Sequence, residues 1–208
     1  MTSTATLRRL CALLAFLAAP LAASADHHET LLLRDPTVSD DALAFVYAGD
    51  LWVTDRDGGD PRRLTTSAAN EHNPHFSPDG RHIAFNVSHR RNEDVYVIAT
   101  SGGTPTRLTW HPGRDRVTGW SADGERIAFS SPREVGNGRS GQLWEVPAAG
   151  GAPLKVMEAP FFLGAWNGGE LAYIPFGPAY NGLYGGSSGW KGYRGGTTPS
   201  VLLLDPRR

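Results

Sequence analysis

The sequence predicts an all-β fold, namely a partial β-propeller of about four four-stranded blades, the last of them incomplete. Short apolar runs recur along the chain, and each leads into a Gly-Gly pair, at Gly58-Gly59, Gly102-Gly103 and Gly150-Gly151. Successive pairs are 44 and then 48 residues apart. A repeat of about 40 to 50 residues that consists of short β-runs and turns is typical of a propeller with one four-stranded blade per repeat.

Four strands are expected in each repeat, and the second repeat shows them most clearly. Their expected ranges are 74–77, 82–88, 94–100 and 105–110. Between the first two lies Ser77-Pro78-Asp79-Gly80, which recurs as Ser121-Ala122-Asp123-Gly124. Ser at the first position, Pro at the second and Gly at the fourth favour a type I turn that closes a hairpin. By the same pattern the four units span about 31–66, 74–110, 116–158 and 161–206.

The fourth unit departs from this pattern in two ways. An insertion at 177–199 separates its second and third strands, and it holds eight glycines and four aromatic residues. The chain then ends at Arg208, directly after the third strand, so we expect the last blade to lack its outer strand. Because so many large rings are unusual in a linker, we expect the insertion to make contacts.

The first 25 residues resemble a secretory signal peptide, which leaves 26–208 as the propeller fragment. Arg8-Arg9 is a charged start, 10–23 is a short apolar run, and Ala23-Ser24-Ala25 is a small-residue cleavage site. The run is shorter than the roughly 20 residues that span a bilayer, so we expect no membrane span. The protein is therefore expected to be exported, either periplasmic or secreted. Its only cysteine, Cys11, lies in the signal, so no disulfide is expected.

The charge balance gives no support to a partner that is a polyanion. The whole chain has 20 basic and 21 acidic side chains, and removal of the signal takes away two arginines. No basic surplus remains for nucleic acid or for an anionic lipid surface, so neither is expected as a partner.

No pattern in the chain predicts a catalytic residue, a cofactor or a metal site. Ser187 lies in a Gly-x-Ser-x-Gly pattern, but no helix is expected after it, so we interpret this stretch as a loop. His72 and His75 have no third ligand in phase for zinc. The stretch from Asp55 to Asp60 resembles a calcium loop, but the next repeat has no carboxylate at the equivalent positions. We therefore interpret it as a hairpin turn.

Three basic residues recur in phase on the expected outer strands, namely Arg63, Arg107 and Lys155. They could form a ring that binds peptides. We favour a solvated outer edge, because charged side chains on an edge strand discourage pairing with stray strands.

Several motifs resemble the amino-terminal propeller of the tricorn-type proteases, over about residues 32–205. They are Tyr47-Ala48-Gly49-Asp50-Leu51-Trp52-Val53, Phe76-Ser77-Pro78-Asp79-Gly80, Leu108-Thr109-Trp110-His111-Pro112-Gly113 and Trp190-Lys191-Gly192-Tyr193-Arg194-Gly195-Gly196-Thr197. The blade motifs also occur in TolB-like propellers and in the propellers of prolyl-oligopeptidase relatives. The last motif, within the insertion, is the one that discriminates between these families.

The resemblance implies a large serine peptidase that degrades oligopeptides. In that family a six-bladed and a seven-bladed propeller precede a PDZ-like module and a catalytic core, and the propellers shield the core and filter access to it. This chain stops before every catalytic position, so it is expected to be a non-catalytic part. The expected partners are the missing blades and the peptidase core of the same polypeptide; peptides are candidate ligands, and the full-length protein could form an oligomer.

Within the insertion, the residues that match the discriminating motif are the candidate site. Trp190, Lys191, Tyr193 and Arg194 are expected to contact either the substrate or a neighbouring domain, by stacking and by charge. A second function stays open, in which the chain is a periplasmic TolB-like propeller that acts as a protein-binding scaffold.

Overall fold

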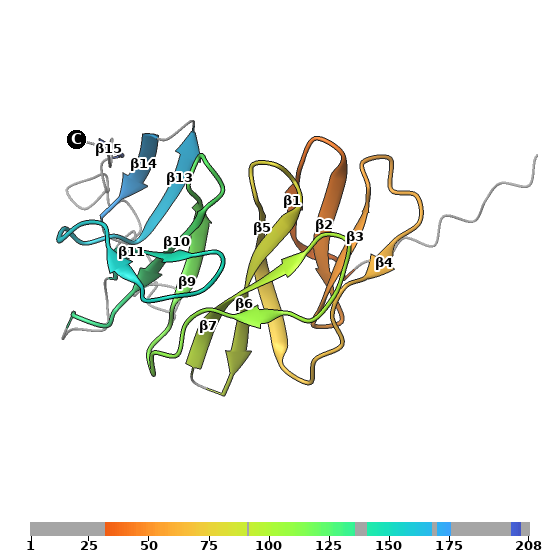
Figure 1. The fold of residues 1–208 in the computed structure, drawn as a ribbon, viewed down its shortest axis with the longest axis horizontal. Coiled ribbons are helices and arrows are strands. Elements are labelled where there is room, and N and C mark those ends of the chain that lie inside the picture. Colours follow the sequence, from red (N-terminus) through yellow and green to blue (C-terminus); the bar gives the residue numbers. More distant parts are fainter. Residues whose placement is uncertain (1–31, 91, 136–140, 168–169, 176–200, 205–208) are drawn as a thin grey trace, which may run out of the picture. The chain divides into compact units, whose positions relative to one another are not determined.

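The computed structural model describes residues 32–90, 92–135, 141–167, 170–175 and 201–204, and within them the chain forms strands and no helix (Figure 1). The strands are β1 (Arg34–Val38), β2 (Ala42–Tyr47), β3 (Asp50–Asp55), β4 (Arg62–Arg63), β5 (Asn70–Phe76), β6 (His82–His89), β7 (Asn92–Ala99), β8 (Thr106–Arg107), β9 (Arg116–Trp120), β10 (Arg126–Ser131), β11 (Gln142–Pro147), β12 (Leu154–Lys155), β13 (Leu163–Asn167), β14 (Glu170–Ile174) and β15 (Leu202–Leu204). None of the described segments is a helix that could cross a membrane. The expected signal peptide, 1–25, and the insertion, 177–199, lie outside the described residues.

Four antiparallel sheets follow one another along the chain, and each is one blade. Their strand orders are β1-β2-β3-β4, β5-β6-β7-β8, β9-β10-β11-β12 and β13-β14-β15. The first strands of consecutive blades contact one another, β1 with β5, β5 with β9 and β9 with β13. The prediction of an all-β propeller fold with four blades is confirmed, and the described part of the last sheet holds three strands.

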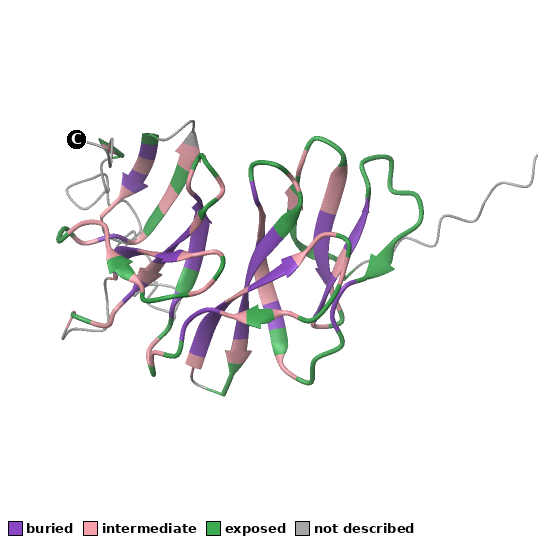
Figure 2. Ribbon diagram, viewed as in Figure 1, coloured by how far each residue is buried: buried purple, intermediate pink, exposed green. Residues whose placement is uncertain are grey.

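The core lies between consecutive blades, where Figure 2 shows the buried residues along the middle strands. Ile83 and Phe85 of β6 pack in a cluster with the first blade, whereas Ala84 between them packs with the third blade. The third blade repeats this arrangement, because Ile127 packs toward the second blade and Ala128 toward the fourth. Successive side chains of a strand point to opposite faces. The Ile-Ala-Phe motif therefore gives each blade a bulky face and a small face, which suits stacking of blade on blade.

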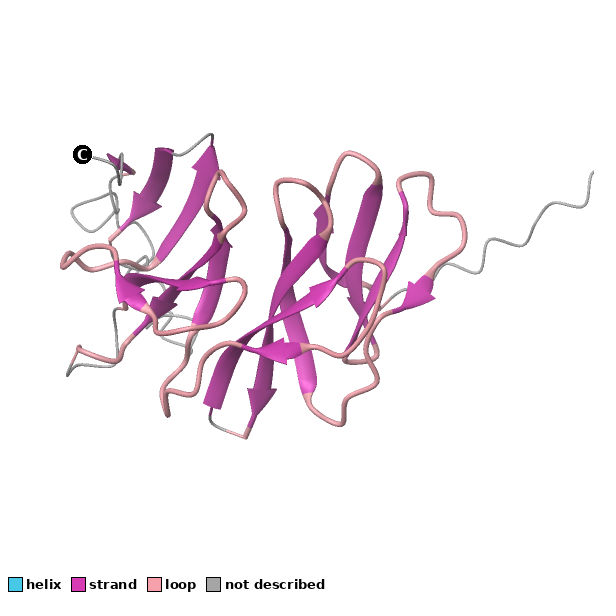
Figure 3. Cartoon of the chain, in the orientation of Figure 1, coloured by secondary structure: helices cyan, strands magenta, loops and turns pink. Residues whose placement is uncertain are grey.

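The predicted turns are present among the connections drawn in Figure 3. The Gly80 N–H donates to the Ser77 carbonyl at 2.9 Å, and the Gly124 N–H donates to the Ser121 carbonyl at the same distance. Gly80 has φ +69°, a conformation that glycine adopts without strain. The Ser77 hydroxyl donates to Asp79 Oδ1 at 2.6 Å and lowers the pKa of that carboxyl. Side-chain and backbone hydrogen bonds thus fix each turn locally, which is why the sequence alone could predict it.

Candidate functional site

The inner strands, one from each blade, carry a cavity near each of their ends. One cavity, of about 430 Å³, is polar and lies along the beginnings of β1, β5 and β9. The other, of about 460 Å³, lies along the ends of β1, β5, β9 and β13. We call them the charged cavity and the neutral cavity, after the side chains that line them.

Arginines dominate the charged cavity. Its lining residues are Arg34, Asp35, Asn70, His72, Ser88, Arg90, Asn92, Glu93, Arg114 and Arg116. Four guanidinium groups therefore face two carboxylates, and the Glu93 carboxylate is further engaged by His72 Nε2 at 3.0 Å. Guanidinium groups form charge-assisted, bidentate hydrogen bonds with carboxylate and phosphate. The cavity is thus suited to an anionic group.

A hydrogen-bonded chain links the inner strands between the two cavities. Asp35 and Asn73 both have positive φ, 49° and 55°, at points where the strand pairing is shifted by a bulge. Asp35 Oδ2 accepts from the Asn73 N–H at 3.1 Å, and Asn73 Nδ2 donates to the Val117 carbonyl at 2.8 Å. Three blades are joined in this way, since these residues lie on β1, β5 and β9. A bulge re-aims side chains, so the bulges help to place different residues at the two ends.

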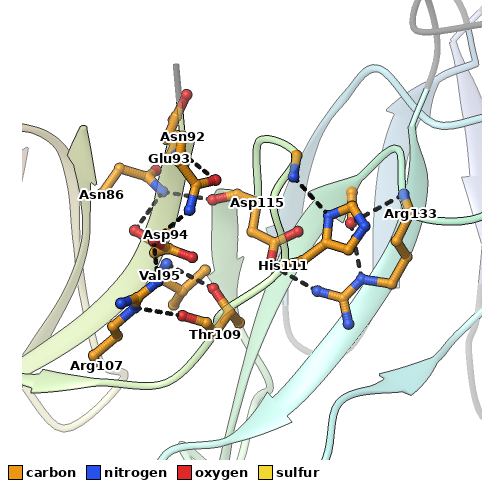
Figure 4. Close-up of polar contacts among 12 residues, drawn as sticks. Asn86, Asn92, Glu93, Asp94, Val95, Arg107, Thr109, His111, Asp115 and Arg133 are labelled. Atoms are coloured by element: carbon orange, nitrogen blue, oxygen red, sulfur yellow. Dashed lines mark hydrogen bonds and ion pairs between the residues drawn. The ribbon is translucent and has the colours of Figure 1, made fainter. Parts of the chain in front are cut away.

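Asn86 on β6 extends this set of hydrogen bonds to the second strand of the second blade, and Figure 4 shows its position. Its side chain is fully buried; Oδ1 accepts from the Val117 N–H at 3.0 Å, and Nδ2 donates to the Asp115 carbonyl at 2.7 Å. It also accepts from Asn73 Nδ2 at 2.9 Å. A buried amide with partners for both of its ends fixes its neighbours firmly, because losing any one of them leaves an unpaired polar atom.

The basic residues of the outer strands are tied to acids, which the expectation of a solvated edge missed. Arg107 Nη2 lies 2.7 Å from Asp94 Oδ2, and Arg63 Nη2 lies 2.6 Å from Asp50 Oδ2. Burial raises the pKa of Asp94, against the opposing effect of Arg107. Lys155 instead contacts Glu134 and Glu158. These ion pairs hold the outer strands in place, and the pair of Arg107 with Asp94 appears in Figure 4.

A third buried ion pair joins two loops of the third blade. Arg133 Nη2 lies 2.6 Å from Asp115 Oδ2, and the Asp115 side chain is fully buried. The guanidinium also lies over the ring of Trp144, at 4.7 Å from its centroid. Burial raises the pKa of Asp115, while hydrogen bonds from Ser131 and the charge of Arg133 lower it. We therefore assign this ion pair a structural role, because it ties two loops of the same blade together.

The neutral cavity is lined by one apolar residue in equivalent register from each blade. The four residues are Val38, Phe76, Trp120 and Trp166, which pair respectively with Leu43, Ile83, Ile127 and Leu171, the second residue of the second strand in each blade. Their neighbours in the cavity wall are Thr37, His75, Pro78, Thr118, Gly119, Ala122, Gly164 and Ala165. No charged side chain belongs to this lining in the described part of the chain. Sequence reasoning did not predict this site, although the change from Phe76-Ser77 to Trp120-Ser121 was visible in the repeat.

His75 contributes an uncharged polar group to the neutral cavity. Burial and, less strongly, the charge of Arg116 lower its pKa to about 4, so the ring is neutral at pH 7. His75 Nε2 lies 3.3 Å from Asn73 Oδ1, and the His75 carbonyl accepts from Trp120 Nε1 at 2.9 Å. His72 and His75, the pair considered for zinc, therefore line different cavities. The described residues contain no group of three metal-ligating side chains.

Of the remaining predictions, the hairpin turn is confirmed, and the others concern residues that lie outside the described part of the chain. Asp55 Oδ1 accepts from the Gly59 N–H at 2.7 Å and the Asp55 carbonyl from the Gly58 N–H at 3.1 Å, so this acidic stretch is the predicted hairpin turn. Ser187 lies outside the described residues. The candidate contact residues lie outside them as well; these are Trp190, Lys191, Tyr193 and Arg194.

Comparison with known proteins agrees with the resemblance read from the motifs. A 54-residue stretch is 50% identical to tricorn protease homolog 2 of Streptomyces coelicolor, and it makes up 26% of this chain and 5% of that protein. The crystal structure of the tricorn protease matches at 24% identity with a TM-score of 0.64, over 83% of this chain and 17% of that one. TolB from Acinetobacter baumannii matches at 19% identity with a TM-score of 0.61, over 84% and 41%.

The chain thus spans a small share of these longer proteins, and the two structural likenesses show the fold. The family described as the tricorn protease N-terminal beta propeller domain matches residues 30–208. This chain belongs to that family.

Proposed function

We propose that this chain is the non-catalytic amino-terminal propeller portion of a tricorn-like serine peptidase that degrades oligopeptides. It shields a catalytic core that follows in the same polypeptide, or filters access to it. The structural observation that carries the proposal is the pair of cavities along the inner strands, charged at one end and neutral at the other. A peptide with a free carboxyl terminus has both a charged end and uncharged side chains, so such a surface can select among peptides.

The charged cavity supports a filter for peptide termini. Its guanidinium donors come from Arg34, Arg114 and Arg116. The hydrolytic residues expected in this family lie farther along the polypeptide. A carboxylate that binds them gains charge-assisted hydrogen bonds, each worth about 1.5–3 kcal/mol.

Exposed apolar side chains on the first and last blades support partners within the same polypeptide. Leu33 directly before β1, Leu163 on β13 and Leu203 on β15 are all exposed. In the propeller core, blades bury such side chains against the next blade. Further blades would cover these residues in the same manner, since exposed apolar patches mark interaction surfaces.

The test uses the natural full-length polypeptide with fluorogenic peptides whose carboxyl terminus is either free or amidated. For Arg116→Gln we expect KM to rise roughly tenfold for free-carboxyl peptides and to change less than about twofold for amidated ones. Arg56→Gln, in an exposed turn of the first blade, is the matched control. Absence of peptide hydrolysis by the full-length protein would refute the peptidase role, and equal effects on both peptide sets would refute the filter.

A second candidate is a protein-binding scaffold, and the similarity to TolB favours it. The DNA downstream of this coding sequence discriminates between the two. An open frame that continues into a second propeller and a peptidase core supports the peptidase. A stop codon followed by an unrelated gene supports the scaffold.

Export to the periplasm or the medium is part of the same proposal, and it rests on the signal-like segment 1–25. Mass spectrometry of the exported protein should find Asp26 as the first residue. Recovery of the protein with an intact Met1 would contradict export through this signal.

A further inference from the structure

We infer that the neutral cavity binds an uncharged aromatic side chain of a peptide, and that a backbone carbonyl of the same peptide accepts hydrogen bonds from Thr118 and Trp166. This inference deepens the proposed function, because it assumes that peptides reach the inner strands. It names a class of peptide residue for one of the two cavities.

Two polar atoms at this cavity lack partners. Thr118 and Trp166 both line the cavity, and Thr118 Oγ1 and Trp166 Nε1 are buried without a hydrogen-bond partner in the described part of the structure. Thr118 is only 6% exposed. Leaving a buried donor unpaired costs about 1–3 kcal/mol, so such groups commonly await a ligand or water. A hydroxyl and an indole N–H can both donate, and a peptide carbonyl has two lone pairs to accept them.

The walls of the cavity are suited to a flat apolar group. Trp166 lies directly against the backbone of Gly119, where an added Cβ would come within 2.6 Å of Trp166 Cδ1. Trp120 lies on the same strand as Gly119, and Phe76 comes from the second blade. Aromatic rings pair in stacked or edge-to-face geometry and gain about 0.5–1.5 kcal/mol beyond burial of area. The volume, about 460 Å³, falls within the usual range of ligand pockets.

The electrostatics of the cavity disfavour charged side chains. Its described lining contains no Asp, Glu, Lys or Arg, and the ring of His75 is neutral at pH 7 because burial lowers its pKa to about 4. A charged side chain placed there would lose hydration without gaining a counter-ion. Arg116, whose charge also lowers the pKa of His75, lines the charged cavity instead. An aspartate or a lysine is therefore rejected, and a phenylalanine is accepted.

The experiment measures binding of three blocked tripeptides to the full-length protein, by tryptophan fluorescence and by calorimetry. The probes are N-acetyl-Ala-Phe-Ala-amide and the same peptide with Asp or Lys in place of Phe. We expect the Phe peptide to bind and the two charged peptides to bind at least roughly tenfold more weakly. Equal or tighter binding of a charged peptide would overturn the inference.

Variants then test the two donors. Thr118→Val removes the hydroxyl with little change of shape and should weaken binding of the Phe peptide roughly two- to tenfold, as should Trp166→Phe. Thr118→Ser restores the hydroxyl and should recover most of the affinity, and Thr104→Val on an exposed loop is the matched control. Thermal unfolding of each variant checks the fold. If Thr118→Val binds the Phe peptide as tightly as the unaltered protein does, the inference is wrong.

Failure of the inference and failure of the proposed function remain distinguishable. Binding of the Phe peptide by a protein that hydrolyses no peptide would remove the peptidase role and keep the aromatic site. Peptide hydrolysis without binding at this cavity, for example because further blades fill it, would keep the peptidase role and remove the site.

Discussion

Replacement of Arg107 by methionine should destabilise the propeller, because it leaves a buried carboxylate without its cation. The side chain of Asp94 is 1% exposed and that of Arg107 is 34% exposed, and the two are joined at 2.7 Å. Removing one partner of a buried ion pair costs about 3–5 kcal/mol. Since Asn92 Nδ2 still donates to Asp94 Oδ2 at 3.0 Å, we expect the lower end, about 3 kcal/mol. Methionine preserves much of the aliphatic stem, so lost packing contributes little.

The assays are urea unfolding and thermal unfolding of the natural polypeptide, both followed by tryptophan fluorescence. A loss of about 3 kcal/mol in a domain of this size corresponds to a fall in Tm of about 6–12 °C. Arg63→Met is the matched control, since it breaks the equivalent pair in the first blade, where Arg63 is 43% and Asp50 is 9% exposed. The Asp50 carboxylate is somewhat less deeply buried than that of Asp94, so this control should lose less stability.

The loss of folding free energy caused by Arg107→Met should also depend on pH. Burial raises the pKa of Asp94 above its ordinary value even with Arg107 present, and removal of the arginine raises it further. The folded state then binds a proton more tightly than the unfolded state. The penalty is therefore absent below the ordinary pKa of aspartate, grows as the pH rises through the raised pKa, and is complete above it. A penalty that does not change with pH, or one no larger than that of Arg63→Met, would refute this account.

Three further outcomes are expected. His75 should titrate near its lowered pKa of about 4 in an NMR titration. The free energy of unfolding should fall as the pH drops from about 6.5 toward 4, because only the unfolded state takes up a proton in that range. An ordinary histidine pKa would contradict the burial of this ring. Gly80→Ala should cost about 1 kcal/mol in urea unfolding because of its positive φ, and no loss would show that the turn adapts. Trp190→Ala with Tyr193→Ala in the full-length protein should reduce assembly or peptide turnover; unchanged assembly and kinetics would remove any role for this motif.

The sequence by itself predicted the blades, because each is closed by local interactions that recur. The Ser77 turn depends on hydrogen bonds between residues at most five apart, and the Ile-Ala-Phe motif of β6 sets both of its packing faces by simple alternation. The ion pair of Arg107 was missed, although both partners recur in phase, because a repeat does not show which side chains face each other across two strands. Asp94 and Arg107 come together only when β7 and β8 pair.

Tertiary structure alone decided the two cavities. By the repeat offset of 44, Trp120 corresponds to Gly164, yet its partner in register is Trp166, because Trp120 pairs with Ile127 and Trp166 pairs with Leu171. The connection between the strands is thus two residues shorter in the last blade, and bulges in the inner strands shift other side chains. Local spacing fixes which residues form strands. Register and blade packing fix which of them meet, since strands from three blades must come together before His75, Thr118 and Trp166 share one cavity.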